Sequence, residues 1–111
     1  MKSFENAWIE LQNAREARAS GLEGRARVCA RRSAGLAIRD YLTEKYGESR
    51  PNSLFELIID KSVRGLLPIQ LVPHLDRLSL RVNQQFQLPD GVDLISEAIM
   101  VISLLETQLE E

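Results

Sequence analysis

Side chains that could do catalytic or metal chemistry are few in this chain, and they lie far apart in the sequence. Among its 111 residues there is one histidine, His74, and one cysteine, Cys29. A metal site needs His, Cys or carboxylate ligands clustered at suitable spacing, and a Ser–His–acid triad needs a histidine beside a serine and a carboxylate. No spacing in the sequence brings such groups together. We therefore expect no catalytic residues, no metal and no cofactor.

The remaining reactive groups have simple structural interpretations. Cys29 lies within an apolar helical pattern and has no histidine near it in the sequence, so we expect a small buried side chain rather than a reactive thiol. His74 falls in the first turn of a predicted helix, where we expect a surface or capping residue. Asp93 and Glu97 form a like-charge i, i+4 pair at the start of the last predicted helix, where the helix dipole favours acids.

Arginine is the residue type whose placement points to binding. Eleven arginines accompany three lysines; seven of them lie between residues 15 and 39, whereas only acidic charges follow Arg81. Arg25, Arg32 and Arg39 recur every seven residues and therefore share one edge of a helix. Guanidinium groups bind carboxylates and phosphates with planar geometry. These three residues and Arg81 are the candidate binding residues for an anion or a partner.

Two interpretations of the arginines stay open. They could neutralise the acidic last helix, within one chain or across a dimer, or they could form a strip that binds RNA or nucleotide phosphates. The net charge of −2 and the sequence pI of about 5.5 are low for a nucleic-acid-binding protein. Such proteins also use exposed aromatic side chains for stacking, whereas we expect the few aromatics here to lie in the core. Pairing with acids is therefore favoured, and nucleic acid is the alternative partner.

The elements that position these residues are all predicted to be helices. Residues 25–46 carry apolar side chains around much of the helix and many small ones, which is typical of a central helix with close neighbours on two or more sides. Before it, a helix that begins with Ser3 as its N-cap should fold back as an antiparallel hairpin across a hinge of Gly21 and Gly24. Gly47 should end the central helix as a left-handed cap.

Three further helices are expected. The capping-box residues Ser53 and Glu56 start one that should end at Gly65, Pro73 fits the first turn of the next, and the last runs from about residue 92 to the C-terminus. The fourth helix should face the core through a narrow seam, and two apolar residues should anchor the polar segment that follows it. The seam residues are Leu71, Leu75, Leu78 and Val82, and the anchors are Phe86 and Leu88.

These features predict one domain, residues 1–111, that folds as an all-α, up-and-down bundle of four to five helices. On the last helix, Met100 and Leu104 form a second apolar stripe nearly opposite the core face, which we expect to be a homodimer contact. The sequence shows no signal-peptide pattern and no apolar run of the ~20 residues that a membrane span needs. A cytoplasmic location without membrane contact is the expectation.

The order of these features resembles that of HEPN domains. Residues 29–42, CARRSAGLAIRDYL, resemble the second helix of that family, which is rich in small residues and is followed by a glycine turn. Residues 52–58, NSLFELI, are similar to the segment that opens its third helix. Residues 75–88, with Arg81 ahead of the sequence FQLPD, resemble the stretch that ends in an aromatic–Pro–Asp turn. The chain from Asp93 onward is similar to the closing helix.

The resemblance implies a four- or five-helix bundle, often dimeric. The family includes nucleases that cut RNA as well as non-catalytic members. Some members of the family act beside a nucleotidyltransferase partner. Its catalytic signature is an arginine followed four to six residues later by a histidine. Here His74 follows Arg64 by ten positions, and no histidine follows Arg81.

The expectation is therefore a non-catalytic, HEPN-like interaction or scaffold module. It should form a homodimer, and a nucleotidyltransferase-type protein is a candidate partner. The alternative function is RNA or nucleotide binding through the arginine-rich face of the central helix, and a residual nuclease is a third hypothesis.

Overall fold

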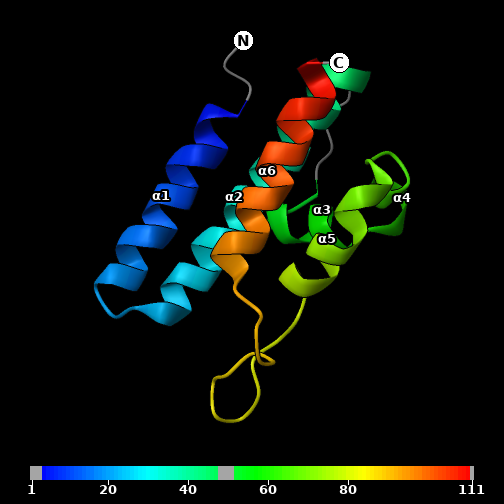
Figure 1. The fold of residues 1–111 in the computed structure, drawn as a ribbon. Helices are drawn as coiled ribbons and strands as arrows, with labels where there is room; N and C mark the ends of the chain where they lie inside the picture. Colours follow the sequence, from blue (N-terminus) through cyan, green and yellow to red (C-terminus); the bar gives the residue numbers. More distant parts are fainter. Residues whose placement is uncertain (1–3, 48–51, 111) are drawn as a thin grey trace.

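Helix α2 (Glu23–Tyr46) is the element against which most of the protein packs (Figure 1). The computed structural model describes residues 4–47 and 52–110, and it contains no strand within these ranges. α2 contacts α1 (Glu5–Ala19), α3 (Leu54–Ile59) and α6 (Leu94–Glu110). The other elements are the short helices α4 (Lys61–Arg64) and α5 (Val72–Leu78), with one 3-10 turn, Ile69–Leu71, between them. The predicted all-α bundle with a central helix is confirmed.

Small residues on α2 let its neighbours approach closely. Its alanines at positions 26, 30, 34 and 37 are fully buried. Gly35 lies against α3, and a Cβ atom placed on it would be only 2.5 Å from the carbonyl oxygen of Leu54. Because no side chain separates the two backbones there, α3 packs directly on α2. Gly47 ends α2 in the left-handed conformation, with φ 68°, as predicted.

The connection between α1 and α2 is a tight Schellman turn. Gly21 has φ 78°, its N–H donates to Arg18 at 3.0 Å, and the N–H of Leu22 donates to Ala17 at 2.8 Å. These bonds satisfy carbonyls that a helix end otherwise leaves unpaired. The predicted hinge is therefore confirmed at Gly21 but wrong at Gly24, which lies inside α2. The predicted cap, Ser3, lies outside the described residues.

The third predicted helix is broken in two at Asp60. The capping box that starts α3 is present as predicted, with the N–H of Glu56 donating to the Ser53 hydroxyl at 3.2 Å. At Asp60 the backbone turns to an extended ψ of 124°, and its carboxylate accepts hydrogen bonds from the N–H groups of Ser62 and Val63 at 2.8 and 3.1 Å. Asp60 therefore acts as the N-cap of a new helix, α4. The prediction of a single unbroken helix that ends at Gly65 was wrong.

Helix α5 ends at Leu78, earlier than the predicted seam implied. Pro73 lies in its first turn as expected. The seam residues Leu71, Leu75 and Leu78 are fully buried, whereas Val82 lies beyond the helix and is 36% exposed. The chain then forms a long segment without regular structure, residues 79–93, here called the excursion, whose loop extends below the helices in Figure 1.

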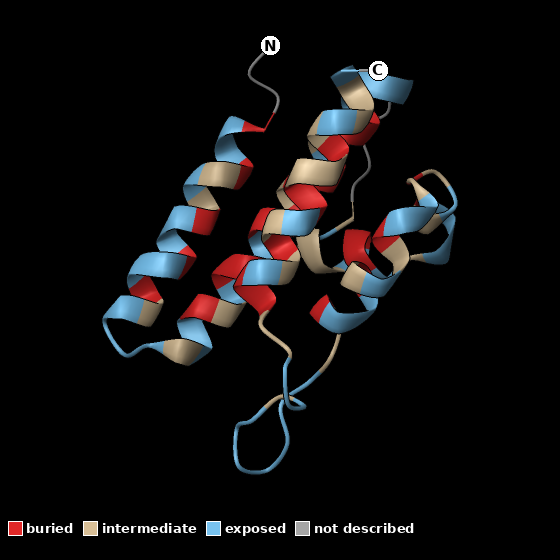
Figure 2. Ribbon diagram, in the orientation of Figure 1, coloured by how far each residue is buried: buried red, intermediate tan, exposed pale blue. Residues whose placement is uncertain are grey.

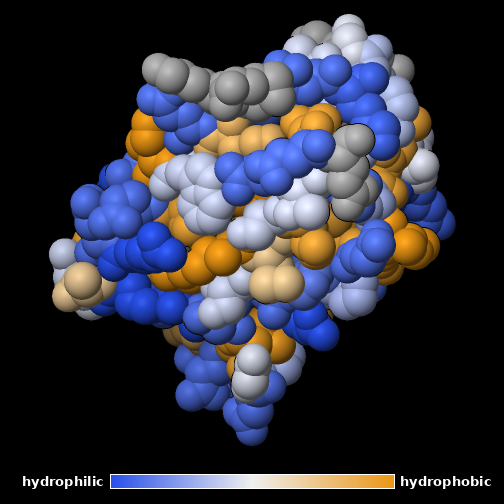
Figure 3. Space-filling view, turned by 45° about the horizontal axis from the view of Figure 1, so that its top comes forward, coloured by the Kyte–Doolittle hydropathy of each residue, from blue (hydrophilic) through white to orange (hydrophobic). Residues whose placement is uncertain are grey.

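The core lies between α1, α2, α6 and the short helices. Figure 2 shows buried residues on the faces that these helices turn toward one another, and exposed residues along their outer faces. The buried positions of α6 follow its apolar face: Leu94, Ile95, Ala98, Val101, Ile102 and Leu105. In Figure 3 hydrophilic side chains cover much of the visible surface, with apolar patches between them. Within the described ranges, no helix combines the length and apolar character that crossing a bilayer requires.

Candidate binding surface

The four arginines predicted as binding residues are not gathered into one site. Arg25 and Arg32 are exposed and line a shallow pocket of about 620 Å³ between α1 and α2, together with Cys29. Arg39 is exposed further along α2. Arg81 lies in the excursion after α5 and lines a different pocket. Arg32 also contacts Glu10 of α1, at 3.1 Å.

Cys29 is buried, as predicted. Its side chain is 7% exposed. Burial and, secondarily, a hydrogen bond with Glu10 raise the pKa of the thiol. Because the thiolate is the reactive form of cysteine, the structure agrees with a packing role for this residue.

The acids of the C-terminal region are paired mostly with residues outside α2. Glu97 lies 2.7 Å from the Nδ1 atom of His74 and 3.1 Å from Arg77. Glu106 accepts a hydrogen bond from the indole N–H of Trp8 at 2.9 Å. Asp93 contacts Arg18 of α1 at 2.8 Å, and Arg18 is one of the seven arginines between residues 15 and 39. Arg25, Arg32 and Arg39 form no ion pair with these acids in the part of the chain that the structure covers.

A different arginine of α2, Arg31, ties the end of α5 to the central helix. Its Nε and NH2 groups donate to the carbonyl oxygens of Leu78 and Leu80 at 2.9 and 2.6 Å. These bonds satisfy a carbonyl at the helix end and one just beyond it. Burial, and then repulsion from Arg27 and Arg81, lower the pKa of Arg31, although a guanidinium remains charged at neutral pH. Arg31 is thus a fixed positive charge held by backbone rather than by a carboxylate.

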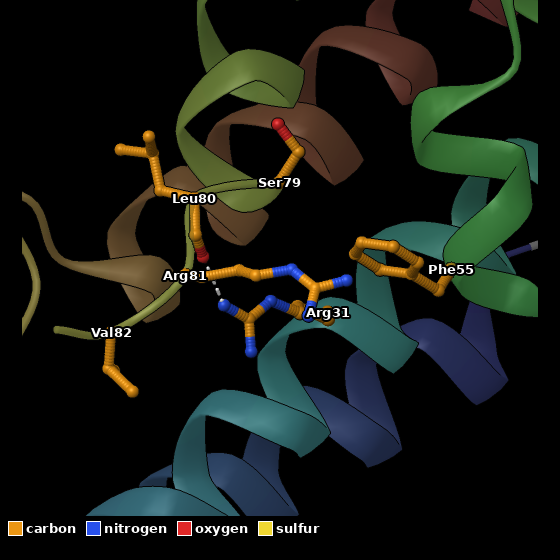
Figure 4. A pocket seen from close by; sticks show the side chains of 6 residues that line it. All are labelled: Arg31, Phe55, Ser79, Leu80, Arg81 and Val82. Atoms are coloured by element: carbon orange, nitrogen blue, oxygen red, sulfur yellow. Dashed lines mark hydrogen bonds between the residues drawn. The ribbon is translucent and has the colours of Figure 1, made fainter. Parts of the chain in front are cut away.

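A pocket of about 480 Å³ lies beside Arg31, between α2, α3 and the chain after α5. Figure 4 shows the side chain of Arg81 extending across it toward the ring of Phe55. Ser79, Leu80 and Val82 complete the lining. Among the described residues, no carboxylate forms an ion pair with Arg81. The pocket therefore combines two guanidinium groups with an apolar wall.

A second pocket, of about 380 Å³, adjoins the first because both are lined by Arg31 and Val82. Arg27 and Phe86 also line it. Arg27 donates from NH1 to the carbonyl oxygen of Phe86 at 3.1 Å, whereas its Nε is buried and lacks a hydrogen-bond partner. One carboxylate is present, that of Glu23, whose nearest oxygen is 3.8 Å from this Nε.

Phe86 lies at the tip of an ordered turn and faces solvent. The Asn83 side chain accepts hydrogen bonds from the N–H groups of Gln85 and Gln87 at 2.9 and 3.0 Å, and the N–H of Asn83 donates to the Gln87 carbonyl at 2.8 Å. This arrangement holds Phe86 at φ 59° with 77% of its surface exposed. A bulky residue rarely adopts a positive φ. The predicted anchoring of Phe86 on the core was wrong, whereas Leu88 does pack against the core.

We define the arginine–phenylalanine surface as the arginines and phenylalanines that line the two adjoining pockets, together with Val82, which both pockets share. Its members are Arg27, Arg31, Phe55, Arg81, Val82 and Phe86. Among these residues, only Arg81 was predicted from the sequence to be a binding residue. The i, i+4 spacing of Arg27 and Arg31 indicates a second basic edge on α2, and the polar residues around Phe86 indicate a turn. Neither sequence pattern shows that this edge of α2 and the turn that carries Phe86 lie side by side in the fold.

On α6, the predicted dimer stripe is partly covered. Met100 is 42% exposed, whereas Leu104 is half-buried and packs against the core.

No family model, curated protein or solved structure matches this chain. Among the described residues, no group of three or more His, Cys, Asp or Glu side chains is arranged to hold a metal ion.

Proposed function

We propose that this chain is a non-catalytic, HEPN-like helical module that acts by binding other proteins and forms a homodimer. The observation that carries the proposal is the arginine–phenylalanine surface. Aromatic residues and arginine are the types enriched at protein interfaces, and a few such residues usually dominate binding energy. Phe86 is exposed in a turn fixed by several hydrogen bonds. It is therefore already ordered for contact with a partner.

The contacts of the residues nearest to the family's catalytic signature support a non-catalytic role. His74 lies 2.7 Å from the carboxylate of Glu97. Arg64 donates to the carbonyl oxygen of Ile58 at 2.9 Å and to Asp76 at 2.6 Å. Both side chains thus link helices. In an RNA-cleavage assay, any activity should be the same in the unmodified protein and in His74→Ala and Arg81→Ala variants. Loss of activity in either variant would contradict this part of the proposal.

The homodimer is proposed to form through Met100 and Leu104. Light scattering at tens of micromolar should give twice the monomer mass of 12.6 kDa. Met100→Glu places a charge in the contact and should give a monomer. Ile69→Glu is the matched control, because Ile69 is 80% exposed and lies outside α6. A monomer mass for the unmodified protein removes the dimer from the proposal.

A second candidate function is RNA or nucleotide binding. Phe55 lines a pocket with Arg31 and Arg81, which form no ion pair with a described carboxylate, and the exposed Phe86 lies beside Arg27. Bases stack on such aromatic rings. A fluorescently labelled single-stranded RNA should then bind at low ionic strength and weaken steeply with added salt. Arg81→Ala should reduce both the affinity and its salt dependence. Absence of RNA or nucleotide binding at low salt would reject this candidate.

The resemblance alone suggests a nucleotidyltransferase-type partner. If the neighbouring gene encodes such a protein, co-expression followed by size-exclusion chromatography tests the pair directly. Separate elution of the two proteins at micromolar concentration argues against that partner.

A further inference from the structure

The two pockets of the arginine–phenylalanine surface form one continuous track. They share Arg31 and Val82, and the track leads from the first turns of α2, past the turn that carries Phe86, to α3 at Phe55. Each pocket has an apolar wall beside guanidinium groups. A ligand that covers the track must therefore offer both negative charge and apolar side chains.

Positive charge dominates this track. Burial lowers the pKa of Arg31, and Arg27 and Arg81 each lie close enough to Arg31 to disfavour its charge and lower this pKa further. A guanidinium carries five N–H donors. Arg31 uses two of its groups on backbone carbonyls, and Arg27 uses one on Phe86. Donors therefore remain on all three side chains for an incoming carboxylate.

The acids near the track are already engaged. Glu23 receives two hydrogen bonds from Arg18, at 2.9 and 2.8 Å, and Arg18 also contacts Asp93. Asp76 contacts Arg64 at 2.6 Å. Among the described residues, Arg31 and Arg81 thus form no ion pair with a carboxylate, and Arg27 has only the 3.8 Å contact with Glu23. A partner that brings carboxylates would add the charge that these arginines lack.

The conformation of Phe86 gives the track a rigid apolar contact. Its positive φ is unfavourable for a phenylalanine, and such backbone strain is found preferentially at binding and switch sites. The turn is held by the Asn83 side chain, and the carbonyl of Phe86 is held by Arg27. Little ordering of this turn is needed when a partner binds, which favours affinity.

From these observations we infer that the arginine–phenylalanine surface binds an acidic peptide segment of a partner protein. Its carboxylates contact Arg27, Arg31 and Arg81, and an apolar side chain packs between Phe86 and Val82. This inference rests on the proposed interaction function and specifies the chemistry of the partner. Protein is favoured over RNA because the linings of both pockets are largely apolar, which suits the apolar side chains of a peptide better than the sugar–phosphate backbone of RNA.

The test uses the full-length protein and a short fluorescein-labelled peptide that is rich in glutamate and has a central phenylalanine. Anisotropy should report saturable binding at low ionic strength. The same peptide with glutamine in place of glutamate, or with alanine in place of its phenylalanine, should bind about tenfold more weakly or not at all. Absence of binding by the glutamate peptide overturns the inference.

Variants of the protein locate the site. Phe86→Asn removes the ring, but asparagine tolerates a positive φ, so the turn and the melting temperature should be retained while affinity falls about tenfold. Arg81→Gln should weaken binding to a similar extent. Arg39→Gln is the matched control, because Arg39 is an exposed arginine of α2 outside both pockets. Equal weakening by Arg39→Gln and Arg81→Gln would show general charge attraction and overturn the inference.

Two further results separate this inference from the broader proposal. If the peptide fails to bind but light scattering still gives a dimer, the interaction module stands and the acidic-segment inference falls. If a labelled RNA binds, displaces the peptide and is itself weakened by Phe86→Asn, the surface belongs to the second candidate function, and the inference is overturned in its favour.

Discussion

Replacement of Gly35 by alanine is the most direct test of how closely α3 packs on α2. The added Cβ would lie 2.5 Å from the carbonyl oxygen and 2.7 Å from the Cβ of Leu54. One of these atoms is backbone and the other is fixed to it, so the first turn of α3 must shift. Alanine gains about 1 kcal/mol over glycine in a helix interior, but overpacking of a close contact typically destabilises by about 1–3 kcal/mol. The approach is far below normal contact distance, so we expect net destabilisation of about 2 kcal/mol.

The assay is urea unfolding followed by circular dichroism, with thermal melting as a second measure. A loss of about 2 kcal/mol should lower the melting temperature by roughly 8 °C or more in a domain of this size. Gly24→Ala is the matched control, because a Cβ there meets nothing within 4 Å and Gly24 also lies in α2. It should stabilise by about 0.5 kcal/mol. If Gly35→Ala stabilises the protein as much as Gly24→Ala does, the direct contact between the two helices is refuted.

Three further predictions concern local contacts. Ser53→Ala removes the hydroxyl that caps α3 and should lower the free energy of unfolding by about 1 kcal/mol in urea titrations. Arg31→Ala leaves two carbonyl acceptors without their charged donor and should lower the free energy of unfolding by about 2–3 kcal/mol in the same titrations. An unchanged free energy of unfolding would show that these two hydrogen bonds contribute nothing to stability. Arg18 lowers the pKa of Glu23 and, likewise, of Asp93. Their ionised forms therefore stabilise the fold above the unfolded-state pKa of about 4, and this stability is lost as pH falls through the folded-state values. Arg18→Gln should flatten that acid dependence in melting experiments across the acidic range.

The helical frame could be predicted from the sequence because its signals act locally. Gly47 ends α2 through its own backbone conformation, the hydroxyl of Ser53 meets an N–H three residues later, and Pro73 fits a first helical turn whatever surrounds it. The break at Asp60 was missed, because the presence of an aspartate does not by itself show whether the residue lies inside one helix or at the N-cap of a second helix. Its side chain acts as a cap only when the backbone turns there.

The binding surface could not be predicted in the same way. The spacing of Arg27 and Arg31 places them on one edge of a helix, but only tertiary packing brings the end of α5 onto that edge. Phe86 was expected to be buried because it is apolar. The hydrogen bonds of Asn83 hold the turn in a form that directs the ring outward, so local polar geometry outweighed hydrophobicity at that position.

The excursion of residues 79–93 lies at the end of the bundle opposite the start of α1 and the finish of α6 (Figure 1). The indole of Trp8, bonded to Glu106, joins those two helix ends. A fusion protein, a purification tag or attachment to a sensor chip at either end of the chain would therefore stand away from Phe86 and leave it open to a binding partner.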